Sequence, residues 1–382
     1  MTTSSTNSTA ASGAGPAVHH RAIIVDGHCD TPYRLLRRNL HLDEHDTEAQ
    51  VDLSSLRASG ITASFFAAYV PPFYSGRGAA RFAYRLIELI HAEVQRLPDV
   101  LTFCSDASGI RRAKDDGKTA ILIGVEGGHA IEDSLSILRD LYRLGARYLT
   151  LTHVNTNNWC DSSGDGGKHN GLTDLGREVV RTMNDLGMIV DISHVSDAAF
   201  YAVLETTRVP VVATHSSCRA LCRHPRNMTD AMLRDLAKNG GICMINFFSA
   251  FLNDAVAQVL MNSQKRVRGE SAGGTEETPD DATDWDLYLK WFNTLGCPQA
   301  TLDDAVDHIL HAAEVAGIDH VGIGTDFDGV PALPRDLQTA AGLPLVTARL
   351  LERGVSEADV EKILGGNFLR VFEQIEAGRR SG

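Results

Sequence analysis

The feature of this sequence that most constrains its fold is a recurring apolar, β-branched segment that ends in polar residues. Eight such segments occur along the chain: Ile23–Asp30, Ile61–Val70, Thr119–Gly127, Tyr148–Val154, Gly187–His194, Val209–Ser217, Gly240–Phe248 and His320–Gly329. Apolar runs of this length are typical of strands that are buried on both faces of a parallel sheet. The repetition therefore predicts a large parallel sheet.

Helical periodicity separates most of these segments. The predicted helices are Ala79–Leu97, Asp133–Leu144, Leu175–Leu186, Met228–Lys238, Ala300–Ala316 and Ser356–Leu364. Asn227 and Ser356 stand at the starts of two of them and are predicted N-caps. Eight strands that alternate with helices indicate an α/β fold, a (β/α)8 TIM barrel, with a doubly wound open sheet as the alternative.

The length of 382 residues suits one large barrel domain. We predict a single catalytic domain over residues 21–376, preceded by a disordered tail at 1–20 that is rich in Ser, Thr, Ala and Gly and ends with His19 and His20. An insertion is expected at about 250–300, because the last two strand segments lie far apart in the sequence. In it, Asn262–Asp284 is predicted to be a surface loop, and the aromatic residues that follow are expected to anchor a helix.

Composition and terminal sequence predict a cytoplasmic protein. The seven cysteines form no close CxxC pair, and Cys218 and Cys222 lack the second pair of a zinc finger. The N-terminus has neither the basic start nor the apolar stretch of a secretory signal, and no apolar run reaches the roughly 18 residues of a membrane span. The net charge of −13 disfavours a nucleic-acid partner.

Residues of the types that bind metals gather where the predicted strands end. They are His28 and Asp30 after the first strand, Glu126 after the third, His153 after the fourth, His194 after the fifth, His215 after the sixth, and Asp326 and Asp328 after the eighth. In a parallel barrel the catalytic side chains come from these carboxyl ends. Buried imidazoles and carboxylates are costly unless they are paired or bind a metal. The pattern therefore predicts a metal site.

Imidazole and carboxylate ligands together suit zinc, with manganese, cobalt or iron as substitutes. The set exceeds the needs of one tetrahedral ion, whereas two metals that share a carboxylate would use it fully and would activate a bridging hydroxide. Walker, GxGxxG, GxSxG and HExxH motifs are absent from the sequence. We therefore predict metal-assisted hydrolysis.

The sequence resembles the membrane (renal) dipeptidase family of zinc peptidases, including its bacterial members. The motifs that carry the resemblance are GVEGGHAI, LTLTH, GLTDLG, VDISHVSD, THSS, RNMTD and GTDFDGV, in the order of the family. They lie between VDGHCDTPYRLL at Val25 and GGNFLRVFE at Gly365, so the resemblance covers nearly the whole chain. It implies a metal-dependent barrel that hydrolyses dipeptides, and the family includes members that act on L-,D-dipeptides.

The resemblance also implies a set of metal ligands. His28 and Asp30 would bind the first of two zinc ions per chain. Glu126 would bridge the two ions, and His194 and His215 would bind the second. Cys29, which stands between the first two ligands where the family commonly has Asn, is expected to point away from the metals.

For the substrate, the resemblance assigns His153 to the scissile carbonyl and Arg226 to the terminal carboxylate of the dipeptide. Asp326 would move the proton from the attacking water to the leaving amine, with Asp328 as the alternative residue for this role. Trp159 is expected to line the pocket. Without the resemblance, Arg226 could equally cap the helix that follows it.

Two alternatives to a dipeptidase stay open at this point. One is another amidohydrolase-type metal hydrolase, with a lactone, an N-acyl compound or a phosphoester as its substrate, because fold alone does not decide function. The other is a barrel without catalytic activity. The family resemblance suggests a homodimer, and the membrane anchor of the mammalian relatives is not carried over, because the C-terminal sequence has no anchor signal.

Overall fold

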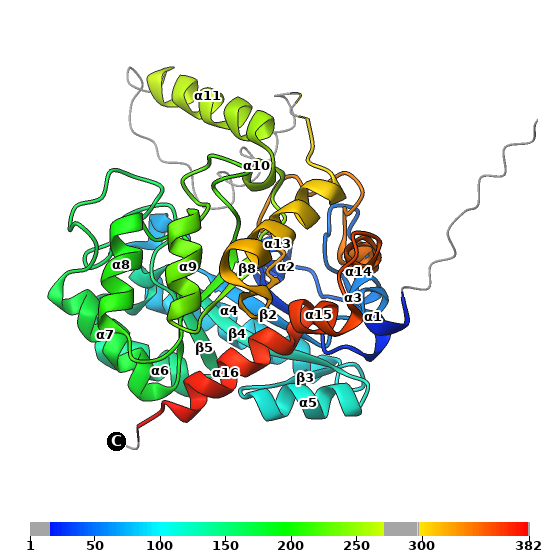
Figure 1. Ribbon diagram of the computed structural model, residues 1–382. Helices are drawn as coiled ribbons and strands as arrows, with labels where there is room; N and C mark the ends of the chain where they lie inside the picture. Colours follow the sequence, from blue (N-terminus) through cyan, green and yellow to red (C-terminus); the bar gives the residue numbers. More distant parts are fainter. Residues whose placement is uncertain (1–15, 271–295, 297, 381–382) are drawn as a thin grey trace, which may run out of the picture.

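The computed structural model describes residues 16–270, 296 and 298–380 (Figure 1). Within this part of the chain, parallel strands form one sheet: β1 Val25–Cys29, β2 Ala63–Tyr69, β3 Leu101–Phe103, β4 Thr119–Glu126, β5 Ala146–Thr150, β6 Ile189–Asp191, β7 Val212–Ser216, β8 Ile242–Ile245 and β9 Val321–Ile323. Strand β2 pairs with both β1 and β4, and β9 pairs with β1 and β8. Eight strands therefore close into a ring, which confirms the predicted barrel.

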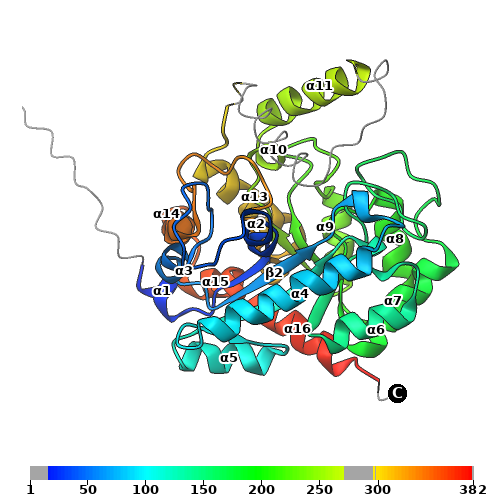
Figure 2. The ribbon, with the colours of Figure 1, turned by 180° about the vertical axis from the view of Figure 1, so that it is seen from behind.

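Helices surround this ring on all sides (Figures 1 and 2). They are α1 Ala17–Arg21, α2 Thr31–Arg38, α3 Leu53–Ser59, α4 Ala79–Arg96, α5 Ala107–Asp115, α6 Leu135–Arg143, α7 Asp174–Leu186, α8 Asp197–Thr206, α9 Asp230–Lys238, α10 Ser249–Leu252, α11 Asp254–Glu270, α13 Leu302–Ala316, α14 Leu343–Glu352, α15 Glu357–Glu361 and α16 Asn367–Ala377. A π-helical turn at Lys362–Gly366 joins α15 to α16. The barrel strands are thereby shielded from water, which explains the long apolar runs in strands such as β4 and β8.

The barrel is closed at the amino ends of its strands by α16. The Phe368 ring of this helix lies edge-on to Phe65 of β2, with 5.5 Å between the ring centroids, and Phe65 in turn contacts Tyr148 of β5. The Tyr148 ring crosses the barrel interior above Gly124 of β4. A Cβ at Gly124 would lie 1.9 Å from the Tyr148 ring, so only glycine leaves room for it. The open end of the barrel is therefore the opposite one, where α10 and α11 lie.

Strand β3 is absent from the sequence prediction. It has three residues and pairs with Thr119–Ile121 at the start of β4, outside the closed ring. Strand β5 pairs with the later part of β4, so β3 occupies an edge that β5 leaves uncovered. A segment this short carries too little periodicity for a sequence-based assignment.

Two predicted helix starts differ in outcome. Ser356 caps α15 as predicted, since its hydroxyl accepts a hydrogen bond from the backbone N–H of Asp359. The prediction of Asn227 as a cap is wrong, because α9 begins two residues later and Thr229 caps it. The Asn227 amide instead donates to the carbonyls of Cys222 and Phe251. It thereby fixes the loop that carries Arg226.

The end of the predicted tail is folded. Ala17–Arg21 forms α1, in which Val18 and His19 are fully buried. The His19 ring lies 2.7 Å from the Thr347 hydroxyl and 2.8 Å from the Ser59 carbonyl oxygen, so these contacts order residues that composition alone assigns to a tail. In the predicted insertion, α10 and α11 are described, whereas Trp285, Tyr288, Trp291 and Phe292 lie outside the described residues.

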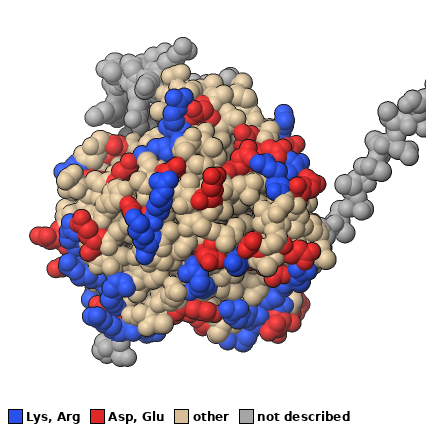
Figure 3. Space-filling view, in the orientation of Figure 1, with Lys and Arg blue, Asp and Glu red and all other residues tan. Residues whose placement is uncertain are grey.

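The distribution of surface charge and the apolar character of the helices concern two classes of partner, nucleic acids and membranes. A nucleic-acid surface needs clustered Lys and Arg side chains. On the face drawn in Figure 3, basic and acidic side chains are interspersed, and this face offers no such cluster. Among the described helices, none combines the length and apolar character that crossing a bilayer requires.

Candidate active site

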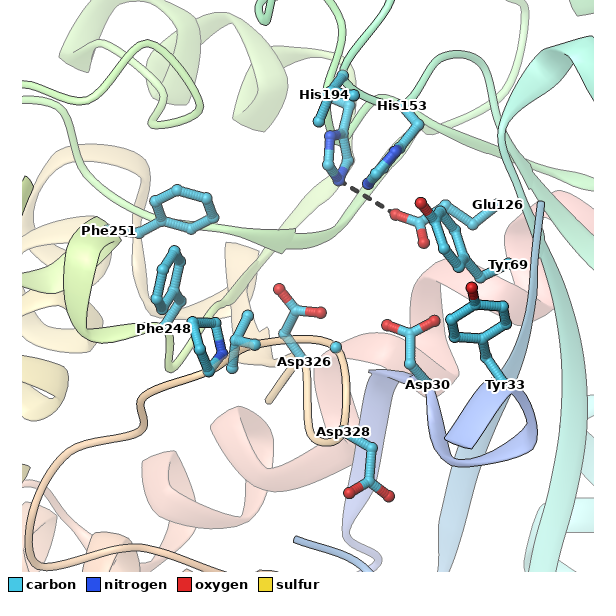
Figure 4. Close-up of a pocket in the computed structure, with 14 residues that line it drawn as sticks. Asp30, Tyr33, Tyr69, Glu126, His153, His194, Phe248, Phe251, Asp326 and Asp328 are labelled. Carbon is cyan, nitrogen blue, oxygen red and sulfur yellow. Dashed lines mark ion pairs between the residues drawn. The ribbon is translucent and has the colours of Figure 1, made fainter. Parts of the chain in front are cut away.

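A cavity of about 230 Å³ opens at the carboxyl ends of the strands (Figure 4). Its lining residues are Asp30, Tyr33, Tyr69, Glu126, His153, Val154, His194, Phe248, Phe251, Asp326, Asp328, Gly329, Val330 and Pro331. These residues follow β1, β2, β4, β5, β6, β8 and β9, so nearly every barrel strand contributes to the cavity. The volume lies below the range of about 300–1,000 Å³ found for drug-sized ligands, which suits a smaller molecule.

The Glu126 carboxylate lies at the centre of the candidate site. Its Oε1 atom is 3.1 Å from Nε2 of His194 and 3.4 Å from Nε2 of His215. Its Oε2 atom is 3.5 Å from Nε2 of His28, which is also 3.1 Å from Oδ2 of Asp30. The nearest histidines thus differ between the two carboxylate oxygens, although the rings of His28 and His215 themselves lie 3.9 Å apart.

These separations fit two metal ions. Zinc binds nitrogen and oxygen ligands at about 2.0–2.2 Å, which places neighbouring ligand atoms about 3.3 Å apart in a tetrahedron. The Nε2 atoms of His194 and His215 are 2.9 Å apart. Two imidazole nitrogens at this distance repel each other unless a cation or a proton lies between them. All five residues have at most 8% of their surface exposed, so water does not compensate for the polarity of their side chains.

The loop after β9 approaches the site through a turn that requires glycine. A Cβ at Gly329 would lie 2.1 Å from Oδ2 of Asp30 and 2.6 Å from Oδ1 of Asp326. On the other side of the loop, Asp26 of β1 accepts hydrogen bonds from the backbone N–H and the hydroxyl of Thr325. These contacts hold the two carboxylates of Asp30 and Asp326 near each other.

The ring of His215 is oriented by a short chain of hydrogen bonds. The Thr214 hydroxyl lies 2.9 Å from Nδ1 of His215 and donates to Oδ2 of Asp191 at 2.7 Å. Because the carboxylate can only accept, the Thr214 oxygen must accept from the His215 Nδ1–H. This leaves the lone pair of Nε2 directed at Glu126. Contacts of this kind fix the tautomer of metal-binding histidines and raise their basicity.

The ring of His28 is oriented in a different way. Its Nδ1 atom lies 2.7 Å from the hydroxyl of Tyr148, the side chain that enters the barrel above Gly124. If Nε2 binds a metal ion, Nδ1 would carry the ring proton and would donate it to the phenol oxygen. The two histidines therefore have outer partners of different kinds, a neutral phenol for His28 and a carboxylate reached through Thr214 for His215.

We expect Tyr148→Phe to weaken metal binding by roughly 10–100-fold, the usual cost of losing an outer contact of a ligand histidine. The substitution removes one oxygen and keeps the ring that fills the barrel. Competition with a chelator measures the affinity, and thermal unfolding of the metal-free protein is the control. An unchanged affinity, or a large loss of stability without metal, would contradict the orienting role.

Asp326 and Asp328 do not share a strand face, because β9 ends at Ile323 and both aspartates adopt positive φ angles, 62° and 61°. Asp326 points toward the centre of the cavity, and Asp328 points away from it (Figure 4). The Asp326 Oδ1 atom is 3.9 Å from Nε2 of His28, and its Oδ2 accepts a hydrogen bond of 2.7 Å from the Asn246 amide. Asp328 instead accepts from the Thr31 hydroxyl and the Gln50 N–H and forms an ion pair with Arg34.

His153 and Arg226 lie beside this centre. Burial lowers the pKa of His153 to about 4, so its ring is neutral at pH 7 and its Nδ1 has no hydrogen-bond partner in the described structure. Arg226 is buried, its Nη2 donates to the His215 carbonyl at 3.1 Å, and its Nε has no partner among the described residues. Thr229 caps α9, so Arg226 does not have the capping role that the sequence left open for it.

Three sequence expectations concern residues beside the site. Trp159 is fully buried against Gly128 and does not line the cavity, so the expectation for it is not met. Cys29 lies in the apolar core beside the Thr31 hydroxyl and belongs to no potential metal group among the described residues. Cys218 and Cys222 bond to backbone carbonyls and belong to no potential metal group among the described residues.

Several residues of the site were not found from the sequence. Tyr148, Asp191 and Asn246 lie inside predicted strand segments, where a polar side chain can face the barrel interior. Alternation along a strand places Tyr148 and Thr150 on one face of β5, and this pattern could have indicated that both side chains face the barrel interior. Their partners come from other strands, so the pairings depend on the closed barrel.

The protein is a (β/α)8 barrel, and histidines and carboxylates from its strand ends surround a small cavity. This combination is typical of metal-dependent hydrolases. The sequence profile of the membrane dipeptidase family (peptidase family M19) matches residues 15–381. Dipeptidase verJ from Clonostachys rogersoniana is 33% identical over 371 residues, which cover 92% of this chain and 84% of that protein. The chain therefore belongs to the membrane dipeptidase family and is a metal-dependent dipeptidase, as the resemblance implied.

Solved structures agree with this assignment. The probable dipeptidase PvdM from Pseudomonas aeruginosa superposes with a TM-score of 0.80 at 25% identity, covering 94% of this chain and 97% of that one. A metallo peptidase from Rhodobacter sphaeroides, liganded with a phosphinate mimic of the dipeptide L-Ala-D-Ala, gives a TM-score of 0.73 at 23% identity, covering 92% and 99%. At that lower identity the second comparison supports the fold alone.

Proposed function

We propose that this dipeptidase uses two zinc ions per chain, with Glu126 as the ligand that both share. The observation that carries the proposal is that the two Glu126 oxygens have different nearest histidines, His28 for Oε2 and His194 and His215 for Oε1. Asp30 would complete the first site, since its Oδ2 lies 3.1 Å from the His28 nitrogen. When bound, the ions would lower the pKa of a water molecule and polarise the scissile carbonyl.

Asp326 is suited to move the proton. It lies on the cavity side of His28, and the Asn246 amide holds its Oδ2, which leaves Oδ1 directed toward the centre. A carboxylate within hydrogen-bond reach of the attacking water can take its proton and then deliver it to the leaving amine. Asp328 is already engaged by Arg34, Thr31 and Gln50, so we assign this role to Asp326.

His153 is suited to stabilise the negative charge that develops on the carbonyl oxygen. It lines the cavity beside His194, with ring centroids 4.5 Å apart. Its neutral ring can donate one hydrogen bond, and a donor aimed at the developing charge stabilises the transition state more than the bound substrate.

Arg226 is suited to bind the terminal carboxylate of the dipeptide. Its Nη2 atom donates to the backbone carbonyl of His215, which places the guanidinium next to a residue of the candidate site. Burial lowers the pKa of Arg226 to about 10, so the guanidinium stays charged at neutral pH. A fixed guanidinium beside the candidate metal ligands would favour dipeptides. In a longer peptide the residue after the scissile bond has no free carboxylate to pair with it.

We expect Arg226→Lys to raise KM for dipeptides by roughly 10–100-fold, with a smaller change in kcat. Lysine keeps the charge and loses the paired N–H donors that match a carboxylate. Steady-state kinetics measures both constants. Arg223→Lys is the matched control, since Arg223 lies in the same loop and pairs with Asp254 at the surface. Equal effects of the two substitutions would argue against a carboxylate clamp.

Hydrolysis of a panel of L-,L- and L-,D-dipeptides by zinc-loaded protein tests the proposed function. Amine release and metal content are determined on the same sample. The proposal predicts cleavage with two metal ions per chain. Two metals without cleavage of any dipeptide would refute the substrate assignment, and cleavage with one metal would refute the shared ligand. Cytoplasmic location and a homodimer stay predictions, which fractionation and light scattering can test.

A further inference from the structure

The cavity has two aromatic walls on opposite sides of the candidate metal ligands. Figure 4 shows Phe248 and Phe251 on one side of Asp326, and Tyr33 and Tyr69 on the other side, next to Asp30 and Glu126. All four aromatic residues line the cavity. A dipeptide whose scissile bond lies at the centre would direct one of its side chains toward each wall.

The phenylalanine wall is a rigid apolar surface. Phe248 and Phe251 pack edge to face, with ring centroids 4.9 Å apart, and Phe251 also contacts the His224 ring at 4.6 Å. Phe251 belongs to the short helix α10, which begins directly after Phe248, and the hydroxyl and backbone N–H of Ser249 anchor this helix by donating to the carbonyls of Leu333 and Ala332. Both phenylalanines are mostly buried, and Val330 and Pro331 line the same cavity. The surface they expose to a ligand is thus preformed.

The position of Arg226 indicates which end of the dipeptide lies at the phenylalanine wall. Its guanidinium carbon lies 5.3 Å from the centroid of the Phe251 ring. If Arg226 binds the terminal carboxylate, the C-terminal residue of the dipeptide lies at the phenylalanine wall. The N-terminal residue then lies toward Tyr33 and Tyr69, whose rings are 5.1 Å apart and perpendicular.

The charges around the cavity disfavour an acidic side chain at either wall. The charged side chains that line it are the carboxylates Asp30, Glu126, Asp326 and Asp328, and the last of these is paired with Arg34. In this arrangement Arg226 is engaged by the terminal carboxylate, and Arg34 is engaged by Asp328. A second carboxylate on the C-terminal residue would therefore meet aromatic faces without a partner, which is costly.

We propose that this enzyme selects dipeptides with a bulky apolar C-terminal residue, and that Phe248 and Phe251 determine this preference. The inference rests on the proposed function and narrows its substrate class. Burial of a large apolar side chain against such a wall corresponds to a gain in kcat/KM of roughly 10–100-fold over Ala at the same position.

The test compares kcat/KM for Ala-Phe, Ala-Leu, Ala-Ala and Ala-Asp with kcat/KM for the reversed peptide Phe-Ala, in the zinc-loaded enzyme and in Phe248→Ala. The wild type is expected to prefer Ala-Phe and Ala-Leu over Ala-Ala by about tenfold or more, and Ala-Asp is expected to be the poorest. In Phe248→Ala the ratio of Ala-Phe to Ala-Ala is expected to fall about tenfold. The ratio of Phe-Ala to Ala-Ala is expected to change much less.

Two controls separate this preference from other failures. Phe73→Ala removes the same side chain from a partly exposed position outside the cavity and should keep all ratios. Phe248→Leu should retain most of the preference, because it keeps an apolar surface. Equal rates for Ala-Asp and Ala-Phe, or an effect of Phe248→Ala on Phe-Ala instead of Ala-Phe, would overturn the inference. Absence of cleavage for every peptide would refute the proposed function instead.

Discussion

Glu126→Gln is expected to lower kcat/KM for a dipeptide by about 1,000-fold or more, equivalent to about 4 kcal/mol of transition-state stabilisation. Glutamine has nearly the same shape, but only one of its two terminal atoms can accept. The Oε1 and Oε2 atoms of Glu126 face different histidines at 3.1–3.5 Å, so the amide can serve one group only. We therefore also expect the zinc content to fall below two ions per chain.

Inductively coupled plasma emission spectroscopy of dialysed protein measures the zinc content, and steady-state kinetics measures kcat/KM. Glu88→Gln is the matched control, because it makes the same chemical change on the exposed face of α4 and should alter neither quantity. Retention of two zinc ions in Glu126→Gln would show that the carboxylate is not shared. The account of the site would then need a different bridging group.

Asp326→Asn is expected to lower kcat by roughly 100–10,000-fold, the range lost with a general acid–base group. Asparagine cannot accept and return a proton. Its amide would also face the Asn246 amide, which now donates to Oδ2 of Asp326 at 2.7 Å. We expect the two zinc ions to be retained, since His28, Asp30, Glu126, His194 and His215 are unchanged.

Asp328→Asn provides the comparison. This residue is bound by Arg34, Thr31 and Gln50, so its loss is expected to lower stability by about 1–3 kcal/mol with a much smaller effect on kcat. Thermal unfolding and kinetics of both variants distinguish the roles. If Asp328→Asn loses kcat and Asp326→Asn does not, the proton carrier is Asp328.

The sequence predicts the barrel well because the information is local. Strands such as β4 are apolar between their two terminal residues, and helices such as α4 and α7 have a clear period of 3.6 residues. The ends of these strands carry the histidines and carboxylates, so their convergence follows from the parallel arrangement. This reasoning does not identify β3, which is too short, or α1, whose order depends on contacts of His19 with Ser59 and Thr347.

The outer part of the site is harder to predict, because it depends on pairs that are distant in sequence. Tyr148 reaches His28 only because Gly124 lacks a side chain, and Asn246 reaches Asp326 across two adjacent strands. The positive φ angles of Asp326 and Asp328 separate two side chains that strand alternation would place together. Trp159 was expected at the pocket from its place in a motif, but the close approach of Gly128 lets its ring pack in the core.

The most direct test of the account is the hydrolysis rate of a dipeptide as zinc is added to metal-free protein. Two ions that share Glu126 predict that the rate reaches its maximum only when about two equivalents of zinc per chain are bound. A maximal rate at one equivalent, with no further increase, would contradict the shared carboxylate on which the account depends.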